Sequence, residues 1–217
     1  MTQRRRAARH LPITHARPRL ILLIRHGETP SNAARVVQTP DTPLSARGRE
    51  QAQRLAARLT SLSVERILAS DLTRAMQTAE AIRAATHAPL EFEPLLQERN
   101  FGDVRGTPYS ELGFDLFAPG VTPPNGESWE VFHQRVAKAW QRVIEVAQRT
   151  PRNLAVVTHG LVCYSLALHQ LKLPGGAVAQ LSLPNTALAL IESSPPHAVE
   201  LWGSTTHLEA TSEGGPA

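Results

Sequence analysis

Residues 20–29 read LILLIRHGET, an unbroken run of five aliphatic side chains followed by arginine, histidine and glycine. A continuous aliphatic run of this length is typical of a strand that is buried on both faces of a sheet. Residues 154–160, LAVVTHG, repeat the pattern and end in the same His-Gly pair. Both segments therefore predict a buried strand with a histidine at its carboxyl end.

Shorter apolar runs at residues 67–69, 188–191 and 199–202 predict further strands. Between the runs, apolar residues recur every three or four positions, which is typical of helices packed on a sheet. Three such stretches begin behind Ser45, Ser70 and Ser128, and a more apolar one covers residues 161–171. Strands alternating with helices predict an α/β fold, a three-layer α/β/α sandwich around a mostly parallel sheet.

The chain has 217 residues, which is enough for one domain with a sizeable core but short for two. We expect residues 20–210 to form that domain. Residues 100–126 hold five glycines and four prolines and predict an irregular excursion over the domain surface.

The basic charge of the chain belongs to its N-terminal end. Residues 1–20 contain six arginines and no acidic residue, so taking six from the net +4 leaves −2 for the other 197 residues. We expect residues 1–19 to be a basic, disordered extension, with a basic arm for RNA or membrane and a transit peptide as alternatives. No aromatic residue is interleaved with these arginines, so we expect no nucleic-acid partner.

Composition indicates a protein of a reducing compartment. No apolar run approaches the roughly 20 residues that span a bilayer, and we expect no membrane partner. The single cysteine, Cys163, excludes an internal disulfide, which favours a cytoplasmic location. Cys163 follows His159 by four residues, but without a CxxC or HExxH pattern we interpret it as a small buried residue, not a metal ligand. The sequence carries no signal for an oligomeric state.

The two His-Gly pairs predict a ligand site, because ligands of α/β sheets bind beyond the carboxyl ends of the strands. Arg25 precedes His26, and Arg74 falls in the first turn of the helix behind Ser70, where free N–H groups favour an anion. Two arginines, two histidines and a helix start predict a site for a dianionic phosphate, since one arginine can bond two phosphate oxygens.

Within this site, His26 is the candidate nucleophile. A neutral imidazole accepts a phosphoryl group, and nearby arginine charges favour the neutral form. We expect His159 to stay protonated and to stabilise the transferring group. Glu98, which precedes the excursion, is the candidate proton donor to the leaving alkoxide. Taken singly, each residue has a commoner structural explanation, as a capping histidine, a solvated arginine or a surface carboxylate.

Several motifs recur in order along residues 20–208. They are RHGET at 25–29 with Asn32, PLS at 43–45, SDLTRA at 70–75, LQERNFG at 96–102, GES at 126–128, THG at 158–160 and HL at 207–208. This series resembles the histidine phosphatase superfamily, in its phosphoglycerate-mutase-like branch. The resemblance implies a three-layer α/β/α fold, a phosphohistidine intermediate on His26, and no metal or organic cofactor.

The resemblance also assigns roles to the other candidates. It implies that Arg25, Arg74 and His159 complete the phosphate pocket and that Glu98 donates and accepts the proton. Thr29 and Asn32 match positions that would support the phosphate or the nucleophile's loop. Thr39 departs from the family pattern, in which many members place glycine after the residue corresponding to Gln38.

Mutases and phosphatases both occur in this branch, and two departures favour a phosphatase. Cofactor-dependent mutases resemble one another in having asparagine after the second His-Gly, where this chain has Leu161. They also carry further cations in the insertion after the catalytic glutamate, whereas residues 100–126 hold one arginine, three acidic residues and no lysine. We predict a metal-independent phosphomonoester hydrolase. A phosphoglycerate mutase and a non-catalytic phosphate-binding protein are the alternatives.

The expected partner is a small-molecule phosphate ester. Four aromatic residues of the excursion, Phe101, Tyr109, Phe114 and Phe117, either line an apolar pocket for a hydrophobic alcohol or pack the excursion onto the sheet. Broad specificity for monoesters is the default expectation.

Overall fold

A six-stranded sheet forms the centre of the protein, whose computed structural model describes residues 19–174, 181 and 183–209. The strands are β1 (Leu20–Arg25), β2 (Val64–Ala69), β3 (Leu90–Phe92), β4 (Asn153–Thr158), β5 (Leu188–Glu192) and β6 (Val199–Ser204). Their order is β3-β2-β4-β1-β5-β6, in which β3, β2, β4 and β1 are parallel and β5 is antiparallel to both its neighbours. The predicted N-terminal extension lies outside the described residues except for Arg19.

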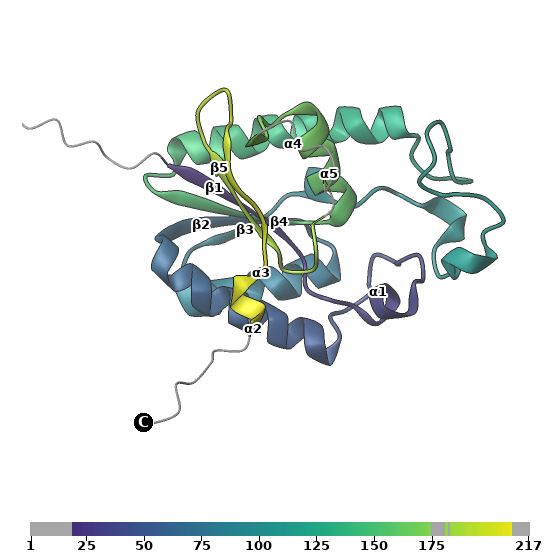
Figure 1. Cartoon of the computed structure of the whole chain (residues 1–217), viewed down its shortest axis with the longest axis horizontal. Coiled ribbons are helices and arrows are strands. Elements are labelled where there is room, and N and C mark those ends of the chain that lie inside the picture. Colours follow the sequence, from purple (N-terminus) through teal and green to yellow (C-terminus); the bar gives the residue numbers. More distant parts are fainter. Residues whose placement is uncertain (1–18, 175–180, 182, 210–217) are drawn as a thin grey trace, which may run out of the picture.

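Helices cover both faces of the sheet (Figure 1). α2 (Ala46–Leu59) and α3 (Thr73–Thr86) lie side by side on one face, and α4 (Trp129–Arg149) and α5 (Gly160–His169) cover the other. The side chains of β1 point alternately to the two faces of the sheet. Leu22 and Ile24 pack towards α2 and α3, whereas Ile21 and Leu23 pack towards α4 and α5. Burial on both faces of the sheet explains why the aliphatic run is unbroken. The predicted α/β/α sandwich with its mostly parallel sheet is confirmed.

Local details depart from the predictions at two places. Ser45 and Ser128 accept the N–H of Gly48 and Val131 as helix N-caps, but α3 begins only at Thr73, behind Leu72. The edge strand β3 was not predicted, because three residues are too few to show a period. Among the described residues, no helix is both long and apolar enough to cross a membrane.

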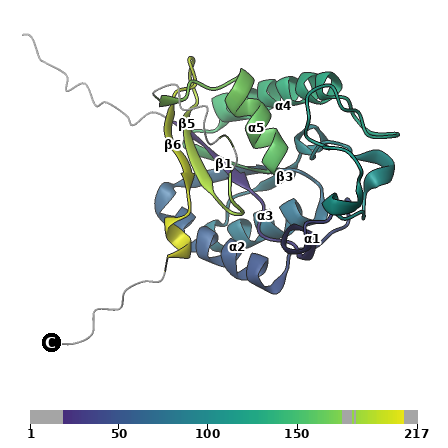
Figure 2. The same ribbon diagram turned by 45° about the vertical axis from the view of Figure 1, so that its right-hand side comes forward.

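Residues 100–126 form an irregular segment at one end of the sheet (Figure 2). It contains two single 3₁₀ turns, Gly102–Val104 and Tyr109–Glu111. The buried Arg99 anchors it by donating to the carbonyl oxygens of Leu116 (3.2 Å) and Val121 (2.6 Å).

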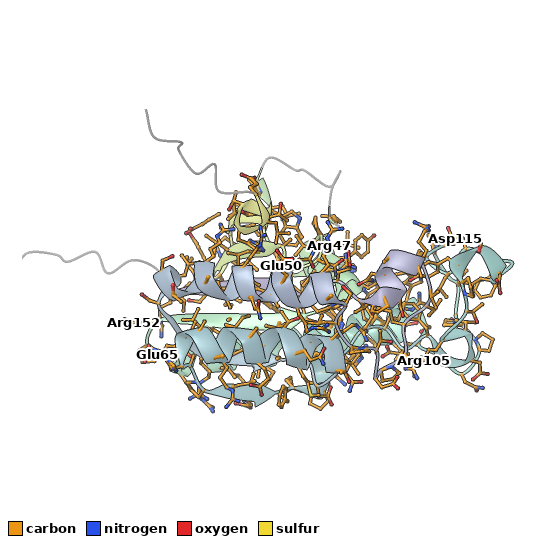
Figure 3. The ribbon with its side chains drawn as sticks, turned by 90° about the horizontal axis from the view of Figure 1, so that it is seen from below. Arg47, Glu50, Glu65, Arg105, Asp115 and Arg152 are labelled. Carbon is orange, nitrogen blue, oxygen red and sulfur yellow. The ribbon has the colours of Figure 1, made fainter. Side chains whose placement is uncertain are left out.

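The excursion lies at the carboxyl end of the parallel strands. Figure 3 labels Arg105 and Asp115 on it, at the end of the molecule opposite to Glu65 and Arg152, which mark the amino ends of β2 and β4. The short helix α1 (Pro30–Ala34), directly after the first His-Gly pair, lies at the same end as the excursion (Figure 1). Ligand-binding residues are expected at this end.

Candidate active site

The carboxyl ends of β1 and β4 bring the two His-Gly pairs together. These strands are parallel neighbours in which Arg25 is paired with Thr158, so the two histidines follow at the same level. The ring centroids of His26 and His159 are 5.1 Å apart, and both side chains are buried. Residues separated by 133 positions in the chain thus meet because their strands share a register.

A cavity of about 250 Å³ opens beside His26. It is lined by Arg25, His26, Asn32, Gln38, Arg74, Glu98, Phe101, Tyr109, Phe117, Gly160, Leu161 and Tyr164. Among the predicted aromatic residues, Phe114 is absent from this lining and is exposed on the surface. Within the described ranges, no group of three or more His, Cys, Asp or Glu side chains is arranged to hold a metal ion. Cys163 is fully buried in the core, as predicted.

Hydrogen bonds fix the tautomer of His26. Its Nδ1 lies 2.7 Å from the carbonyl oxygen of Gly27, which can only accept, so Nδ1 carries the proton. The Nε–H of Arg74 donates to Nε2 at 3.3 Å, so Nε2 presents a lone pair. Burial first, and the charges of Arg74 and Arg25 next, hold the pKa of His26 well below its ordinary value. A neutral imidazole whose Nε2 carries no proton is the nucleophilic form.

The two predicted arginines lie on either side of this nitrogen's pocket. Arg74 is 2% exposed and donates to the carbonyl oxygen of Thr39 at 3.1 Å, and burial lowers its pKa to about 10. Arg25 donates to the carbonyl oxygen of Leu183 at 2.7 Å, while its buried Nε has no hydrogen-bond partner. Within the described residues, neither guanidinium forms an ion pair with a carboxylate. A buried cation, Arg74, and a half-buried one, Arg25, without an ion-paired carboxylate favour an anionic ligand.

His159 lies at the N-cap of α5, and its Nε2 is 2.8 Å from the hydroxyl of Ser70. Its Nδ1 is buried and has no partner among the described residues. Burial, then Arg74 and His26, hold the pKa of His159 well below its ordinary value. The neutral form is therefore favoured in the site without a phosphate, and protonation of His159 beside a bound phosphoryl group stays a prediction.

Glu98 borders the same cavity, with its carboxylate held by two backbone N–H groups. Oε1 accepts from Arg99 at 2.9 Å, and Oε2 accepts from Leu161, at the start of α5, at 3.2 Å. Burial raises the pKa of Glu98 above its ordinary value, although these bonds and the charges of Arg74 and Arg25 oppose the shift. A carboxyl that keeps its proton at higher pH is suited to act as an acid.

Thr29 and Asn32 occupy different positions relative to the cavity. Thr29 is buried at the N-cap of α1, where its hydroxyl accepts the N–H of Asn32 at 3.0 Å and donates to Gln38 at 2.9 Å. It does not line the cavity, so it can act only on the conformation of this loop. Asn32 does line it, and its Oδ1 accepts from the amide of Asn185 at 3.2 Å.

Several contacting residues were not predicted. Asn185 donates to the carbonyl oxygen of His26 at 3.0 Å, and the N–H of Thr186 donates to the same oxygen at 3.2 Å. Neither residue type signals catalysis, and nothing in the sequence connects them to His26. Ser70, the partner of His159, directly follows β2. The rule that singled out the histidines, a polar residue at the carboxyl end of a strand, would have found it.

Comparisons with known proteins identify the family of this chain. Residues 21–204 match a family model described as the histidine phosphatase superfamily (branch 1). "Phosphoglycerate mutase-like protein 4" of Arabidopsis thaliana is 33% identical over 88% of this chain and 87% of its own length. "Probable phosphoglycerate mutase GpmB" of Salmonella choleraesuis is 32% identical over 88% of this chain and 95% of its own. The solved structure of the alpha-ribazole phosphatase from Shigella flexneri is 28% identical, covers 86% of this chain and 96% of its own, and superposes with a TM-score of 0.75.

Proposed function

The chain belongs to the histidine phosphatase superfamily (branch 1), and from that premise we propose that it hydrolyses phosphate monoesters without a metal, through a phosphohistidine on His26. One observation carries the proposal: the lone pair of His26 Nε2 lies beside Arg74, and among the described residues neither Arg74 nor Arg25 forms an ion pair with a carboxylate. A phosphoryl dianion bound to the arginines would lie within reach of this nitrogen.

In the first step, His26 Nε2 attacks phosphorus, and the bond between phosphorus and the ester oxygen breaks. The departing alkoxide takes the proton of Glu98, whose raised pKa supports its role as the acid. The Nδ1–H bond to the Gly27 carbonyl stabilises the positive charge that develops on the imidazole. The arginines and the unpartnered Nδ1 of His159 are available to bind the phosphoryl oxygens.

In the second step, water takes the place of the departed alcohol. Glu98, now ionised, removes a proton from the water as its oxygen bonds to phosphorus and the P–N bond breaks. Phosphate leaves, and both His26 and Glu98 return to their starting protonation states. The same carboxyl thus serves as acid and then as base.

The composition of the pocket supports a phosphatase over a mutase. The arginines that line it are Arg25 and Arg74, and both are committed to the phosphoryl group. The rest of the lining combines apolar side chains, with Phe101, Phe117 and Leu161 among them, and the uncharged amides of Asn32 and Gln38. A second acidic group on the substrate would find no cation in this part of the lining.

The apolar side chains of the lining also support a class of substrate, esters of aromatic or aliphatic alcohols. A second cavity of about 450 Å³ adjoins the catalytic pocket and shares Phe117, Leu161 and Tyr164 with it. Its further lining includes Trp129 and His133. An alcohol too large for the catalytic pocket would continue into this space and bury apolar surface there.

A phosphoglycerate mutase is the second candidate, which two observations favour. Two of the relatives carry mutase names. Arg105 lines a neighbouring cavity of about 380 Å³ that also borders Arg74 and Glu98, so a cation is present on that side. Such an enzyme needs a bisphosphorylated primer and returns phosphate to the substrate, not to water.

The test is phosphate release in the presence of EDTA from a panel of monoesters that includes p-nitrophenyl phosphate, alpha-ribazole phosphate and 3-phosphoglycerate. We expect release to survive EDTA and to vanish in His26→Ala, and acid-labile, base-stable phosphate to be trapped on the wild-type protein only. No release from any ester, with turnover in a primed mutase assay, would replace the phosphatase by the mutase. No turnover in either assay, with phosphate still bound, would indicate a non-catalytic binding protein.

Glu98→Ala tests the acid in the same panel. We expect the largest loss of kcat on alkyl esters, whose alkoxides need a proton, and the smallest on p-nitrophenyl phosphate. An equal loss on both would count against a proton donor at this position. We further propose a cytoplasmic location, which the single buried cysteine supports.

A further inference from the structure

Arg135, on the second turn of α4, directs its hydrogen bonds to the segment that carries Glu98. Its Nη1 donates to the carbonyl oxygens of Leu95 (2.8 Å) and Gln97 (2.7 Å). Its Nη2 donates to the carbonyl oxygen of Glu98 at 3.1 Å. The remaining bonds, from Nε at 2.8 Å and Nη2 at 2.7 Å, go to the two carboxylate oxygens of Glu127. A guanidinium has five N–H donors, and these five bonds use all of them.

Glu127 holds the same segment from the other side of Glu98. Its Oε2 also accepts the backbone N–H of Asn100 at 2.8 Å, and its own N–H donates to the Asn100 carbonyl at 2.8 Å. Burial raises the pKa of Glu127, but hydrogen bonds from Arg135 and Asn100 outweigh it and hold the pKa below its ordinary value. The carboxylate is therefore ionised at neutral pH, and the ion pair is largely shielded, with side chains 18% and 15% exposed.

The position of the Glu98 carboxyl depends on this backbone. Residues 97–101 belong to neither a helix nor a strand, and the carboxyl is held by the N–H of Arg99 within the segment and of Leu161 outside it. Proton transfer needs the donor within about 2.6–3.2 Å of the leaving oxygen, so a small shift of the segment removes the acid from reach. A loop meets that tolerance only when its backbone is fixed by other elements.

We propose that the Arg135–Glu127 ion pair is a positioning device that holds Glu98 in line with the leaving oxygen, an inference that rests on the proposed function above. Neither Arg135 nor Glu127 lines the cavity beside His26, although both line the neighbouring cavity that borders Arg74 and Glu98. All five donors of Arg135 are used within the protein, so the pair acts through Glu98 and not on the substrate. Its loss impairs protonation of the leaving group and leaves phosphate binding and attack by His26 intact. A lysine cannot replace Arg135, because three donors cannot make five bonds.

The test compares an alkyl phosphate with p-nitrophenyl phosphate in Arg135→Gln. We expect kcat on the alkyl ester to fall about tenfold or more with little change in KM, and kcat on p-nitrophenyl phosphate to stay within about twofold. Arg135→Lys, the variant to use if the glutamine variant does not fold, should show the same pattern with a smaller loss. Arg142→Gln is the matched control, because this arginine of the same helix pairs with Glu91 and Glu93, outside the pocket lining, and should leave both substrates unaffected.

Two further readouts separate positioning from a general loss of structure. In a Glu98→Ala background, adding Arg135→Gln should lower kcat on the alkyl ester no further, because the pair acts only through Glu98. In the single variant, water admitted to Glu98 should move the alkaline limb of kcat to lower pH.

Three outcomes would overturn the proposal. An equal loss on both substrates, or an additional loss in the Glu98→Ala background, would make the ion pair merely structural. A larger loss of kcat on the alkyl ester than on p-nitrophenyl phosphate in Glu98→Ala, but not in Arg135→Gln, would show that the ion pair does not position Glu98. The acid role of Glu98 would still stand. Absence of that larger loss in Glu98→Ala itself would instead overturn the acid role on which the inference rests.

Discussion

At the scale of single residues, the site is built from ordinary side chains whose properties depend on burial. His26 is neutral because it is buried and lies beside Arg74 and Arg25, and those arginines have no carboxylate in contact to cancel their charge. The same burial raises the pKa of Glu98 and so favours its protonated form. Burial in one pocket therefore favours a neutral imidazole and a protonated carboxyl at once, which are the two forms that the proposed mechanism needs.

The protonation of His26 can be tested directly. Because neutral His26 is favoured by burial first and by Arg74 second, we expect its NMR titration to occur well below pH 6.5 in the wild-type protein. Arg74→Gln removes a positive charge and should move that titration to higher pH. Arg83→Gln, an exposed arginine of the same helix paired with Glu80, is the control and should leave the titration unchanged. An unchanged titration in Arg74→Gln would show that this arginine does not lower the pKa of His26.

At the scale of elements, the site depends on how closely α2 approaches the loop after β1. A Cβ on Gly48, in the first turn of α2, would overlap the carbonyl group of Glu28, and a Cβ on Gly27 would lie 2.6 Å from the carbonyl oxygen of Gly48. The glycines thus allow two backbones to touch. Hydrogen bonds complete the contact, from the N–H of Ser45 to the carbonyl oxygen of Glu28 and from the N–H of Glu28 to Gln51.

Gly48→Ala tests this approach. Because backbone cannot yield as a flexible side chain does, we expect the free energy of unfolding to fall by about 2 kcal/mol and kcat to fall with it, as the loop of His26 is displaced. Urea denaturation and p-nitrophenyl phosphate turnover measure the two effects. Arg54→Ala, in the same helix with a side chain 45% exposed and paired with the exposed Glu50, should change neither. Wild-type stability and activity in Gly48→Ala would show that the contact is not needed.

At the scale of the whole molecule, the fold lowers the pKa of four described histidines, His26, His133, His159 and His207. His26 and His159 have strongly lowered pKa values, and burial lowers the pKa of His207, which contacts Thr186 beside the site, to about 4. In the unfolded chain, histidine titrates near pH 6.5. Between these values the unfolded state binds protons that the folded state does not.

The stability of the protein should therefore fall on acidification. Above about pH 6.5 both states are neutral at these histidines and stability is flat; as pH falls from about 6.5 to about 4, the unfolded state gains protons and the free energy of unfolding declines. Each fully buried histidine contributes up to about 1.4 kcal/mol per pH unit in this window. Urea denaturation at pH 7.0, 5.5 and 4.5 measures it. Added inorganic phosphate should oppose the decline by binding only the folded state, and a flat profile would contradict the assignment of neutral histidines.

Much of the fold could be predicted from the sequence because the pattern of buried strands is local. The aliphatic runs at residues 20–24 and 154–158 indicated β1 and β4, and the resemblance carried the order of the motifs. The edge strand β3 gave no such signal, since its three residues are short and half exposed. The start of α3 was also misplaced, because Ser70 bonds to His159 and does not cap the helix.

The sequence by itself determined the candidate residues of the site: two histidines and an arginine at strand ends, a second arginine at a helix start, and Glu98 before the excursion. Those are properties of residue type and local position. Only the tertiary structure decided the protonation states of these residues and the hydrogen bonds that hold them, because burial and long-range contacts set both. The Asn185 contact to His26 joins residues 159 positions apart, and the bond from Arg135 to the Glu98 carbonyl joins residues 37 positions apart. The lowered pKa of His159 depends on burial. A pKa or a hydrogen bond of this kind exists only when distant segments exclude water together.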